Sequence, residues 1–186
     1  MNGDTGEIDW YFQFTPHDVH DWDAIQVPIL ADLNIDGQDR RVMMWANRNA
    51  FFYSIDAADG EFLKASPFAT QTWAQGLDAN GRPVRVPGMA PTYEGIMVSP
   101  PITGGTNWYS PGFSPDTGLF YVTAFDGEQV FFKRDEDYEE GERYTGGGGR
   151  YDRPMDAFKS WIRAVDPTTT ETVWEFPIMP RSSAGI

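Results

Sequence analysis

The sequence contains no cysteine and few basic residues. Its 186 residues include 28 Asp and Glu against 14 Lys and Arg, which gives a net charge of −14. Without cysteine, neither a disulfide framework nor a thiolate metal site can form. A surface this negative repels phosphate backbones and anionic lipid head groups, which argues against nucleic acid and membrane surfaces as partners. The charge favours cations as ligands, or simply indicates a solvated acidic surface.

Long apolar runs are missing as well. No run approaches the ~18 residues that a membrane helix needs, so we expect no membrane insertion. The opening stretch, Met1–Trp10, lacks the basic and apolar regions of an export signal, and we expect no signal peptide in this chain. Its turn-forming residues indicate that the chain starts in the middle of an architecture.

Aromatic residues and turn formers are abundant. Aromatic residues make up 15% of the chain, which also has 19 Gly and 14 Pro. Bulky flat side chains between frequent turns are typical of β proteins. Because long helical patterns are absent, the sequence predicts an all-β fold.

Strand–turn–strand units recur along the chain. Residues 51–63 and 161–174 each read as a strand that ends in Asp56 or Asp166, a short turn and a second strand. Residues 4–10 look like the second half of the same unit. Further strands are predicted at Val27–Leu33, Arg41–Ala46, Leu119–Thr123 and Gln129–Lys133. Hairpins that return at short intervals indicate a propeller or a sandwich.

Two regions lack this pattern. Residues 68–112 are irregular and rich in Pro and Gly, and loops of that length are usually functional or disordered. Residues 135–149 combine an acidic run with four consecutive glycines, Gly146–Gly149. We interpret this second region as a solvated insertion, with a binding loop as the alternative.

The densest polar cluster is Thr15–Asp23, which reads Thr-Pro-His-Asp-Val-His-Asp-Trp-Asp. Asp21 and Asp23 are two residues apart, so in an extended segment both carboxylates project to one side. A hard cation would offset their repulsion, and a metal next to a carboxylate base is a workable catalytic site. The alternative is a solvated acidic turn. His17 and His20 are too few for a convincing transition-metal site.

Four stretches follow one another in a distinctive order. Residues 10–23 read W-x-x-x-x-T-P-H-D-x-x-D-x-D, residues 47–53 contain Arg-Asn and end in Tyr, and residues 100–108 read P-P-x-x-G-G-x-N-W. Residues 164–174 run from Ala through Asp to Trp, as the tryptophan-docking motif of propeller blades does. Together they resemble the pyrroloquinoline quinone (PQQ) dependent alcohol dehydrogenases, the methanol/ethanol family of eight-bladed β-propellers.

The resemblance implies a role for individual residues. Asp21 would be the catalytic base, taking the alcohol hydroxyl proton while hydride moves to PQQ, and would also bind the metal. The metal would polarise the quinone carbonyl as a Lewis acid. Arg48 would hydrogen-bond the quinone oxygens, and Asn107 and Trp108 would contact the cofactor.

Asp23 bears on the identity of the metal. Calcium-dependent members of the family often carry a small residue at this position, whereas lanthanide-dependent members carry Asp. A trivalent ion favours one more anionic ligand. The resemblance therefore implies a lanthanide(III) ion bound by Asp21 and Asp23, with Ca²⁺ as the alternative.

The resemblance also implies how the chain is organised. Residues 1–67 would be a blade end plus one blade, residues 68–112 long active-site loops, and residues 113–186 an elaborated blade. These would be two to three blades of an eight-bladed propeller that needs its remaining blades. The parent enzyme would oxidise a small primary alcohol in the periplasm and pass electrons to a cytochrome c. Because the family's Glu and Asn metal ligands lie upstream of this chain, we expect it to be inactive alone. Because propeller blades stabilise one another by packing side by side, we also expect it to fold poorly.

Three residues depart from the family pattern. His20 stands where an aromatic or apolar residue is usual, Ala50 replaces the Gly that follows the Asn, and Thr170 replaces a docking Gly. If Ala50 adopts a positive φ, it carries strain that Gly would avoid.

The alternative function is a non-enzymatic, calcium-stabilised β-propeller binding module. Its calcium loop would be residues 32–37, which read Asp-Leu-Asn-Ile-Asp-Gly. An EF-hand would need a bidentate Glu where Met43 stands. The simpler interpretation is that Asp36 and Gly37 form the turn of a hairpin between the two strands predicted on either side.

Overall fold

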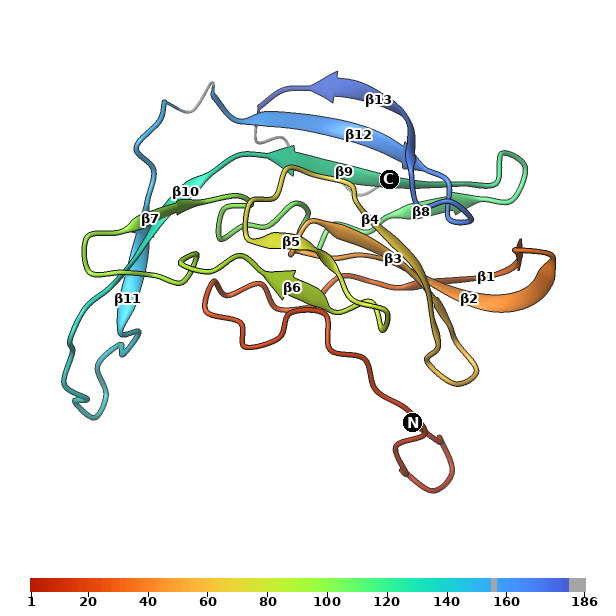
Figure 1. The fold of residues 1–186 in the computed structure, drawn as a ribbon, viewed down its shortest axis with the longest axis horizontal. Coiled ribbons are helices and arrows are strands. Elements are labelled where there is room, and N and C mark those ends of the chain that lie inside the picture. Colours follow the sequence, from red (N-terminus) through yellow and green to blue (C-terminus); the bar gives the residue numbers. More distant parts are fainter. Residues whose placement is uncertain (155–156, 181–186) are drawn as a thin grey trace.

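The computed structural model describes residues 1–154 and 157–180, and nearly all of its regular structure is β-strand (Figure 1). The strands are β1 (Ile29–Ile35), β2 (Gln38–Ala46), β3 (Phe51–Asp56), β4 (Phe62–Pro67), β5 (Ala74–Leu77), β6 (Pro83–Arg85), β7 (Ile96–Val98), β8 (Gly112–Ser114), β9 (Leu119–Asp126), β10 (Gln129–Lys133), β11 (Gly147–Arg150), β12 (Lys159–Val165) and β13 (Thr172–Ile178). The described residues contain no helix with the length and apolar character to cross a membrane. The predicted all-β class is confirmed.

The first blade is the antiparallel sheet β1-β2-β3-β4. Asp36 and Gly37 join its first two strands with φ angles of 52° and 83°, and Ile35 pairs with Gln38 across this turn. Two consecutive positive φ angles match the right-handed twist of a tight hairpin, which Asp-Gly adopts readily. The interpretation of Asp36-Gly37 as a hairpin turn is therefore confirmed.

The second blade is the antiparallel sheet β13-β12-β9-β8. The predicted unit at residues 161–174 lies in its outer hairpin, where Ala164 pairs with Trp174. Between β9 and β12 the chain leaves this sheet and forms β10 and β11, which join β7 in a three-stranded sheet. Part of the predicted insertion at residues 135–149 thus belongs to a strand, β11.

The two blades pack face to face (Figure 1). Every residue of β3 is buried, because alternate side chains enter two different cores. On one side the ring of Phe52 lies 4.9 Å from that of Phe120, and Ser54 Oγ donates to the carbonyl of Pro167 at 2.6 Å. The apolar core between the blades consists of Ile35, Val42, Met44, Ala46, Ala50, Phe52, Phe68, Ala69, Phe120, Val122, Ala124 and Val165. Adjacent sheets that pack in this way without closing into a ring form a partial propeller, as predicted.

The opposite side of β3 is covered by the N-terminal segment and by the long connection between the blades. This second core contains Phe14, Trp22, Met43, Phe51, Tyr53, Ile55, Trp73, Ala74, Val98 and Phe131. Burial raises the pKa of the Tyr53 hydroxyl, which accepts a hydrogen bond from Asn49 Nδ2 at 3.1 Å. The residues predicted to be catalytic lie at the rim of this core.

Of the turns that share one geometry, three account for the predicted repeat. The amides of Gly6, Gly60 and Thr170 donate to the carbonyls of Asn2, Asp56 and Asp166, at 2.9, 2.9 and 2.7 Å. Their φ angles are 74°, 78° and 64°. The opening residues 4–10 keep the turn of the unit but, among the described residues, they pair with no strand.

Trp10 shows what this turn is for. Its indole nitrogen donates to the carbonyl of Ala57 at 3.2 Å, and its ring lies over Gly60, where a Cβ atom would come within 2.6 Å. A glycine is needed because the aromatic ring packs directly on the backbone. Trp10 therefore docks the N-terminal segment on the β3–β4 turn of the first blade.

Candidate functional site

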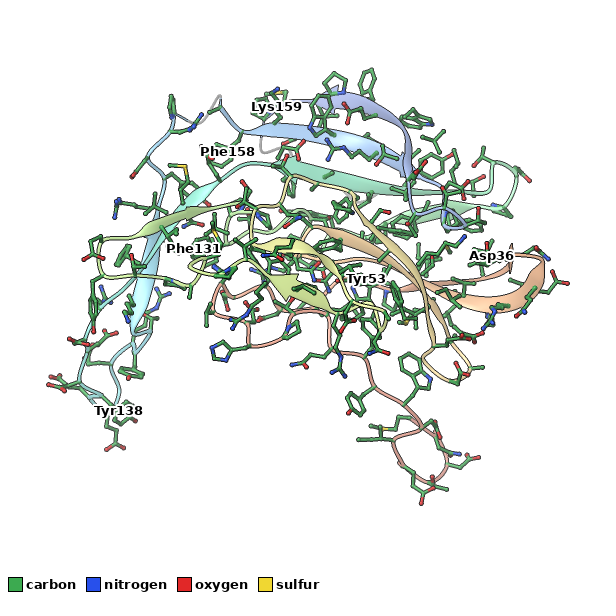
Figure 2. All side chains as sticks on the ribbon, in the orientation of Figure 1. Asp36, Tyr53, Phe131, Tyr138, Phe158 and Lys159 are labelled. Carbon is green, nitrogen blue, oxygen red and sulfur yellow. The ribbon has the colours of Figure 1, made fainter. Side chains whose placement is uncertain are left out.

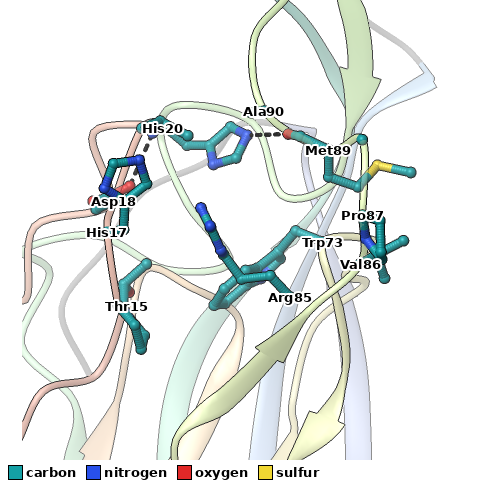
Figure 3. A pocket seen from close by; sticks show the side chains of 13 residues that line it. Thr15, His17, Asp18, His20, Trp73, Arg85, Val86, Pro87, Met89 and Ala90 are labelled. Carbon is teal, nitrogen blue, oxygen red and sulfur yellow. Dashed lines mark hydrogen bonds between the residues drawn. The ribbon is translucent and has the colours of Figure 1, made fainter.

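In the sequence, Asp21 stands between two residues whose aromatic side chains are anchored in the core. Trp22 is 1% exposed and donates from its indole nitrogen to the carbonyl of Pro101 at 3.0 Å. His20 is 6% exposed, stacks on Trp22 with the ring centroids 4.3 Å apart, and bonds through Nε2 to the carbonyl of Met89 at 2.9 Å (Figure 3). Asp21 itself is exposed and has a φ of 65°. This left-handed conformation costs a residue other than glycine about 1–2 kcal/mol, so the surrounding structure must hold it.

A pocket with a volume of about 590 Å³ opens beside Asp21. Its walls are mostly apolar, and Phe131, labelled in Figure 2, is one of them. The lining residues are Val19, His20, Asp21, Ala90, Pro91, Ile102, Phe131, Phe132, Lys133, Arg143 and Thr145–Gly148. The glycine-rich end of the insertion therefore forms one wall, a contribution that its acidic composition did not indicate. A carboxylate at the edge of an apolar pocket is suited to proton abstraction from a small organic molecule.

Close packing explains why Gly147 of this wall is a glycine, and it makes the contact at Gly148 tight. Cβ atoms on Gly147 and Gly148 would come within 2.5 Å of the Phe132 carbonyl and 3.1 Å of the Phe132 ring. A Cβ atom on Gly149 would come within 2.0 Å of the Gln129 side chain. Gly147 thus lets β11 lie directly against the backbone of β10, which the composition alone did not reveal.

A smaller pocket of about 290 Å³ shares Val19, His20 and Ala90 with the first one (Figure 3). Arg85 lines it together with His17 and the ring of Trp73. His20 lines both pockets, and its hydrogen-bond partner Met89 lines the smaller one.

Arg48 is buried and lies close to Asp23. One of its terminal nitrogens donates to the carbonyl of Ile102, and the other lies 3.9 Å from an Asp23 carboxylate oxygen. Its Nε atom is buried and has no hydrogen-bond partner within residues 1–154 and 157–180. The turn that carries it ends at Ala50, whose φ is 76°. Ala50 therefore carries the strain that a glycine at this position would avoid.

Asn49, next to Arg48, was not singled out from the sequence. Its side-chain amide donates to the carbonyl of Phe14 at 2.9 Å, and its own carbonyl accepts from the Trp73 indole at 3.0 Å. Asn49 therefore ties the Arg48 turn to the N-terminal segment that carries Asp21. The sequence feature that could have identified Asn49 is its position next to Arg48 in the motif that resembles the family.

Asn107 and Trp108 lie apart from Asp21. They line a different pocket of about 350 Å³, together with Tyr109 and Phe125. Asn107 donates to the carbonyl of Thr103 at 2.8 Å, and Trp108 is 66% exposed. Pro101 and Thr103 face this pocket, whereas Ile102 faces the pocket of Asp21. One short loop, residues 101–103, therefore borders both pockets. Among the described residues, Asn107 and Trp108 line one pocket and Asp21 lines the other.

The alternative calcium loop is engaged in ion pairs. Asp32 lies 3.1 Å from Arg41 and Asp36 lies 2.8 Å from Lys64. The one group of three acidic residues close enough to share an ion, within the ranges that the structure describes, is Asp56, Asp59 and Glu61, and Arg40 pairs with two of its members. Cationic side chains thus already compensate both sets of carboxylates.

The residues around Asp21 fit a hard metal ion, which prefers oxygen ligands, and a quinone. Asp21 and Asp23 are exposed carboxylates; among the described residues, Asp23 pairs with Arg48 alone and Asp21 forms no ion pair. The buried guanidinium of Arg48 keeps an unpartnered donor at Nε. Anionic oxygens for a hard cation and planar donors for a carbonyl are the chemistry that such a pair of ligands requires.

The family described as "Glucose/ethanol/alcohol dehydrogenase, beta-propeller domain", under the name PQQ, matches residues 1–76. Quinoprotein ethanol dehydrogenase of Pseudomonas putida is 37% identical over 182 residues, which are 92% of this chain and 29% of that protein. The 1-butanol dehydrogenase (cytochrome c) of Thauera butanivorans is 43% identical over 124 residues, covering 67% of this chain and 18% of that protein. The chain thus spans less than a third of the length of these curated relatives.

Solved structures agree with these relatives. The quinohemoprotein alcohol dehydrogenase of Comamonas testosteroni superposes with a TM-score of 0.87 at 28% identity, over 98% of this chain and 29% of that one. A europium-containing methanol dehydrogenase superposes with a TM-score of 0.79 at 28% identity, over 91% of this chain and 31% of that one. The repeated blade turns, the motif order and these likenesses have one explanation: the chain belongs to the PQQ-dependent alcohol dehydrogenase family and corresponds to part of its β-propeller.

Proposed function

We propose that this chain supplies the proton-abstracting side of the active site of a PQQ-dependent alcohol dehydrogenase. The observation that carries the proposal is Asp21. Asp21 is exposed, and its backbone has a left-handed conformation between two residues, His20 and Trp22, whose rings are anchored. It also borders an apolar pocket of about 590 Å³. A strained acidic residue at the edge of a pocket is a feature of functional sites.

Asp21 acts as the general base that accepts the hydroxyl proton of a primary alcohol. The apolar walls, which include Ile102 and Phe131, hold the carbon chain of the alcohol and exclude water. PQQ, when bound, would supply a hydride acceptor, and a bound metal ion would supply a Lewis acid. Substrate binding and proton abstraction are thus the part of the reaction that these residues perform.

Arg48, Asn107 and Trp108 contact the cofactor in this proposal. The free Nε donor of Arg48 supports its role as a hydrogen-bond donor to quinone oxygens. Asn107 and Trp108 lie on the loop whose Ile102 reaches the Asp21 pocket, and Trp108 presents an exposed ring for stacking. The remaining blades of the propeller complete the cofactor site from the other side.

Asp21 and Asp23 hold the metal ion. Asp23 is 62% exposed and pairs with Arg48 across 3.9 Å, so it is available to a stronger cation. A lanthanide(III) ion is favoured over Ca²⁺ because a second carboxylate adds charge to the ligand set. The likeness to a europium-containing methanol dehydrogenase supports this choice.

The whole protein oxidises a small alcohol in the periplasm and passes its electrons to a cytochrome c. The likeness to 1-butanol dehydrogenase (cytochrome c) of Thauera butanivorans supports both the substrate class and the acceptor. This chain alone lacks turnover in our proposal, since it spans less than a third of its relatives.

The test uses a complete propeller. This chain replaces the segment that it matches in the quinoprotein ethanol dehydrogenase of P. putida, and the chimera is loaded with PQQ and either Ca²⁺ or La³⁺. We expect oxidation of primary alcohols that depends on both additions. A folded, PQQ-loaded chimera without alcohol oxidation, beside an active parent enzyme, would contradict the proposal.

The choice of metal is tested in the same chimera by Asp23→Ala. Removing one anionic ligand should raise the La³⁺ concentration needed for half-maximal activity by roughly tenfold or more, with a smaller effect for Ca²⁺. Asp32→Ala is the control, because it removes an exposed carboxylate from β1, where it pairs with Arg41. Unchanged activity of Asp23→Ala with both ions would exclude Asp23 as a ligand.

A further inference from the structure

The carboxylate of Asp18 brackets the residue proposed as the base. One Asp18 oxygen accepts from the amide of His20 at 2.9 Å, and the other accepts from the amide of Trp22 at 2.6 Å. Asp21 lies between these two amides in the chain. The bond from Asp18 to His20 is drawn in Figure 3.

Both bonds are charge-assisted, and such bonds are shorter and about twice as strong as neutral ones. They act on the stretch of backbone where Asp21 has a φ of 65°. Without them, the backbone at Asp21 is free to relax to an ordinary negative φ. That rotation would carry the Asp21 carboxylate away from the pocket it borders.

The outer side of the turn is fixed independently. The His20 ring bonds to the carbonyl of Met89, and the Trp22 indole donates to the carbonyl of Pro101. These contacts hold the flanking side chains in the core, whereas the Asp18 carboxylate holds the flanking amides. The side chains and the backbone are thus fixed from two directions, and Asp21 is the member of the turn that remains exposed.

We propose that Asp18 is a positioning residue for proton abstraction: its carboxylate clamps the amides on either side of Asp21 and keeps the base aimed at the alcohol. Asp18 has no contact with substrate in this account, because both of its oxygens face the backbone. The inference rests on the proposed role of Asp21 as the base.

The test compares Asp18→Asn with a matched control in the chimera. An Asn keeps one acceptor but turns an N–H group toward the other backbone amide, so one clamp is lost. Asp78→Asn is the control for removing the charge of a carboxylate that caps a turn, since one Asp78 oxygen, which Asn keeps, accepts from the amides of Asn80 and Arg82 at 2.8 and 2.9 Å in the β5–β6 turn. Turnover is normalised to bound PQQ, so that unfolded molecules do not count.

We expect Asp18→Asn to lower kcat by about 10- to 100-fold, since a displacement of about 1 Å costs that much at an active site. KM for ethanol and the PQQ content should change by less than about threefold, and Asp78→Asn should leave kcat within about twofold. The clamp is refuted if Asp18→Asn retains parental kcat, or if both variants lose kcat equally.

Two further variants separate the possible failures. Asp21→Asn is measured alongside: parental turnover of that variant overturns the proposed function, whereas loss of turnover in Asp21→Asn but not in Asp18→Asn overturns only the positioning role. Asp18→Ser keeps one hydroxyl acceptor, and its kcat should lie between that of Asp18→Asn and that of the parent chimera. If neither Asp18 variant loads PQQ, Asp18 has a structural role and the inference is wrong.

Discussion

His20 occupies a position where the family usually has an aromatic or apolar residue, and it behaves as an aromatic. Its ring stacks on Trp22 and meets the ring of Phe131 edge-on at 4.8 Å. Burial lowers the pKa of His20, the bond to Met89 and the charge of Asp18 oppose this, and the charge of Arg85 adds to it. The net effect is a pKa below the ordinary value of 6.5.

This lowered pKa predicts how folding depends on pH. Below pH 6.5 the unfolded chain takes up a proton before the folded one does, so stability is complete above that pH and declines as pH falls toward the lower folded pKa. One such group contributes at most about 1.4 kcal/mol per pH unit. In the chimera, His20→Phe should flatten the pH dependence of the free energy of unfolding, measured in urea between about pH 5 and 7. A slope identical to that of the parent would contradict this.

At the residue scale, the sequence singled out Asp21, Asp23 and Arg48 because their motifs are dense and specific, and the structure brings Arg48 within 3.9 Å of Asp23. It did not reveal the clamp formed by Asp18, since a run of polar residues does not show which carboxylate faces the backbone. It also did not show that Asn107 faces another pocket, because a loop of alternating side chains serves both cavities.

At the scale of elements, the blade turn illustrates how one hydrogen-bond pattern serves different side chains. Gly60 and Gly118 both have positive φ, 78° and 70°, and both donate to a carbonyl four residues earlier, at 2.9 and 2.8 Å. They differ in their surroundings. A Cβ atom on Gly60 would strike the ring of Trp10, whereas one on Gly118 would meet nothing within 4 Å.

These two glycines allow the docking contact to be measured. Gly118→Ala should cost about 1–2 kcal/mol, the conformational penalty alone. Gly60→Ala should cost roughly 1–3 kcal/mol more, because the Trp10 ring must also move. The measurement is urea unfolding of both variants in the chimera. Equal losses of stability would show that Trp10 does not depend on a bare backbone at Gly60.

The elements that the sequence predicted best are those with turn chemistry. The Asp-Gly hairpin and the strand Gln129–Lys133 were found where expected, since alternation and turn residues agree there. The strands β5, β6, β7, β8 and β11 were missed. None is longer than four residues, which is too short for alternation to show, and β7 pairs with β10, a partner distant in the chain that local patterns do not encode.

At the scale of the molecule, the two tryptophans of the blade turns have different environments. Trp10 is docked on the following turn, whereas Trp174 is 43% exposed on β13, the edge strand of the second blade. Val173 and Phe176 on the same strand are 57% and 61% exposed. Among the described residues, no further blade covers this apolar edge, and uncovered edges of that kind promote association.

The open edge predicts the behaviour of the 186-residue chain on its own. It should self-associate in sedimentation velocity experiments, and it should oxidise no ethanol when PQQ and Ca²⁺ or La³⁺ are added. Phe176→Lys should reduce the association by placing charge on the apolar edge, whereas Tyr11→Lys, an exposed position outside the strands, should not. A monomer that unfolds cooperatively and turns over with PQQ would contradict this expectation.

The most direct test of the central claim, that Asp21 is the base, is the rate at which ethanol reduces bound PQQ in a single turnover of the chimera. Asp21→Asn keeps the size of the side chain but removes the proton acceptor. The account predicts that this rate falls by roughly 10²–10⁴-fold while PQQ content stays near that of the parent. A rate within about twofold of the parent would contradict it and move the base to another residue.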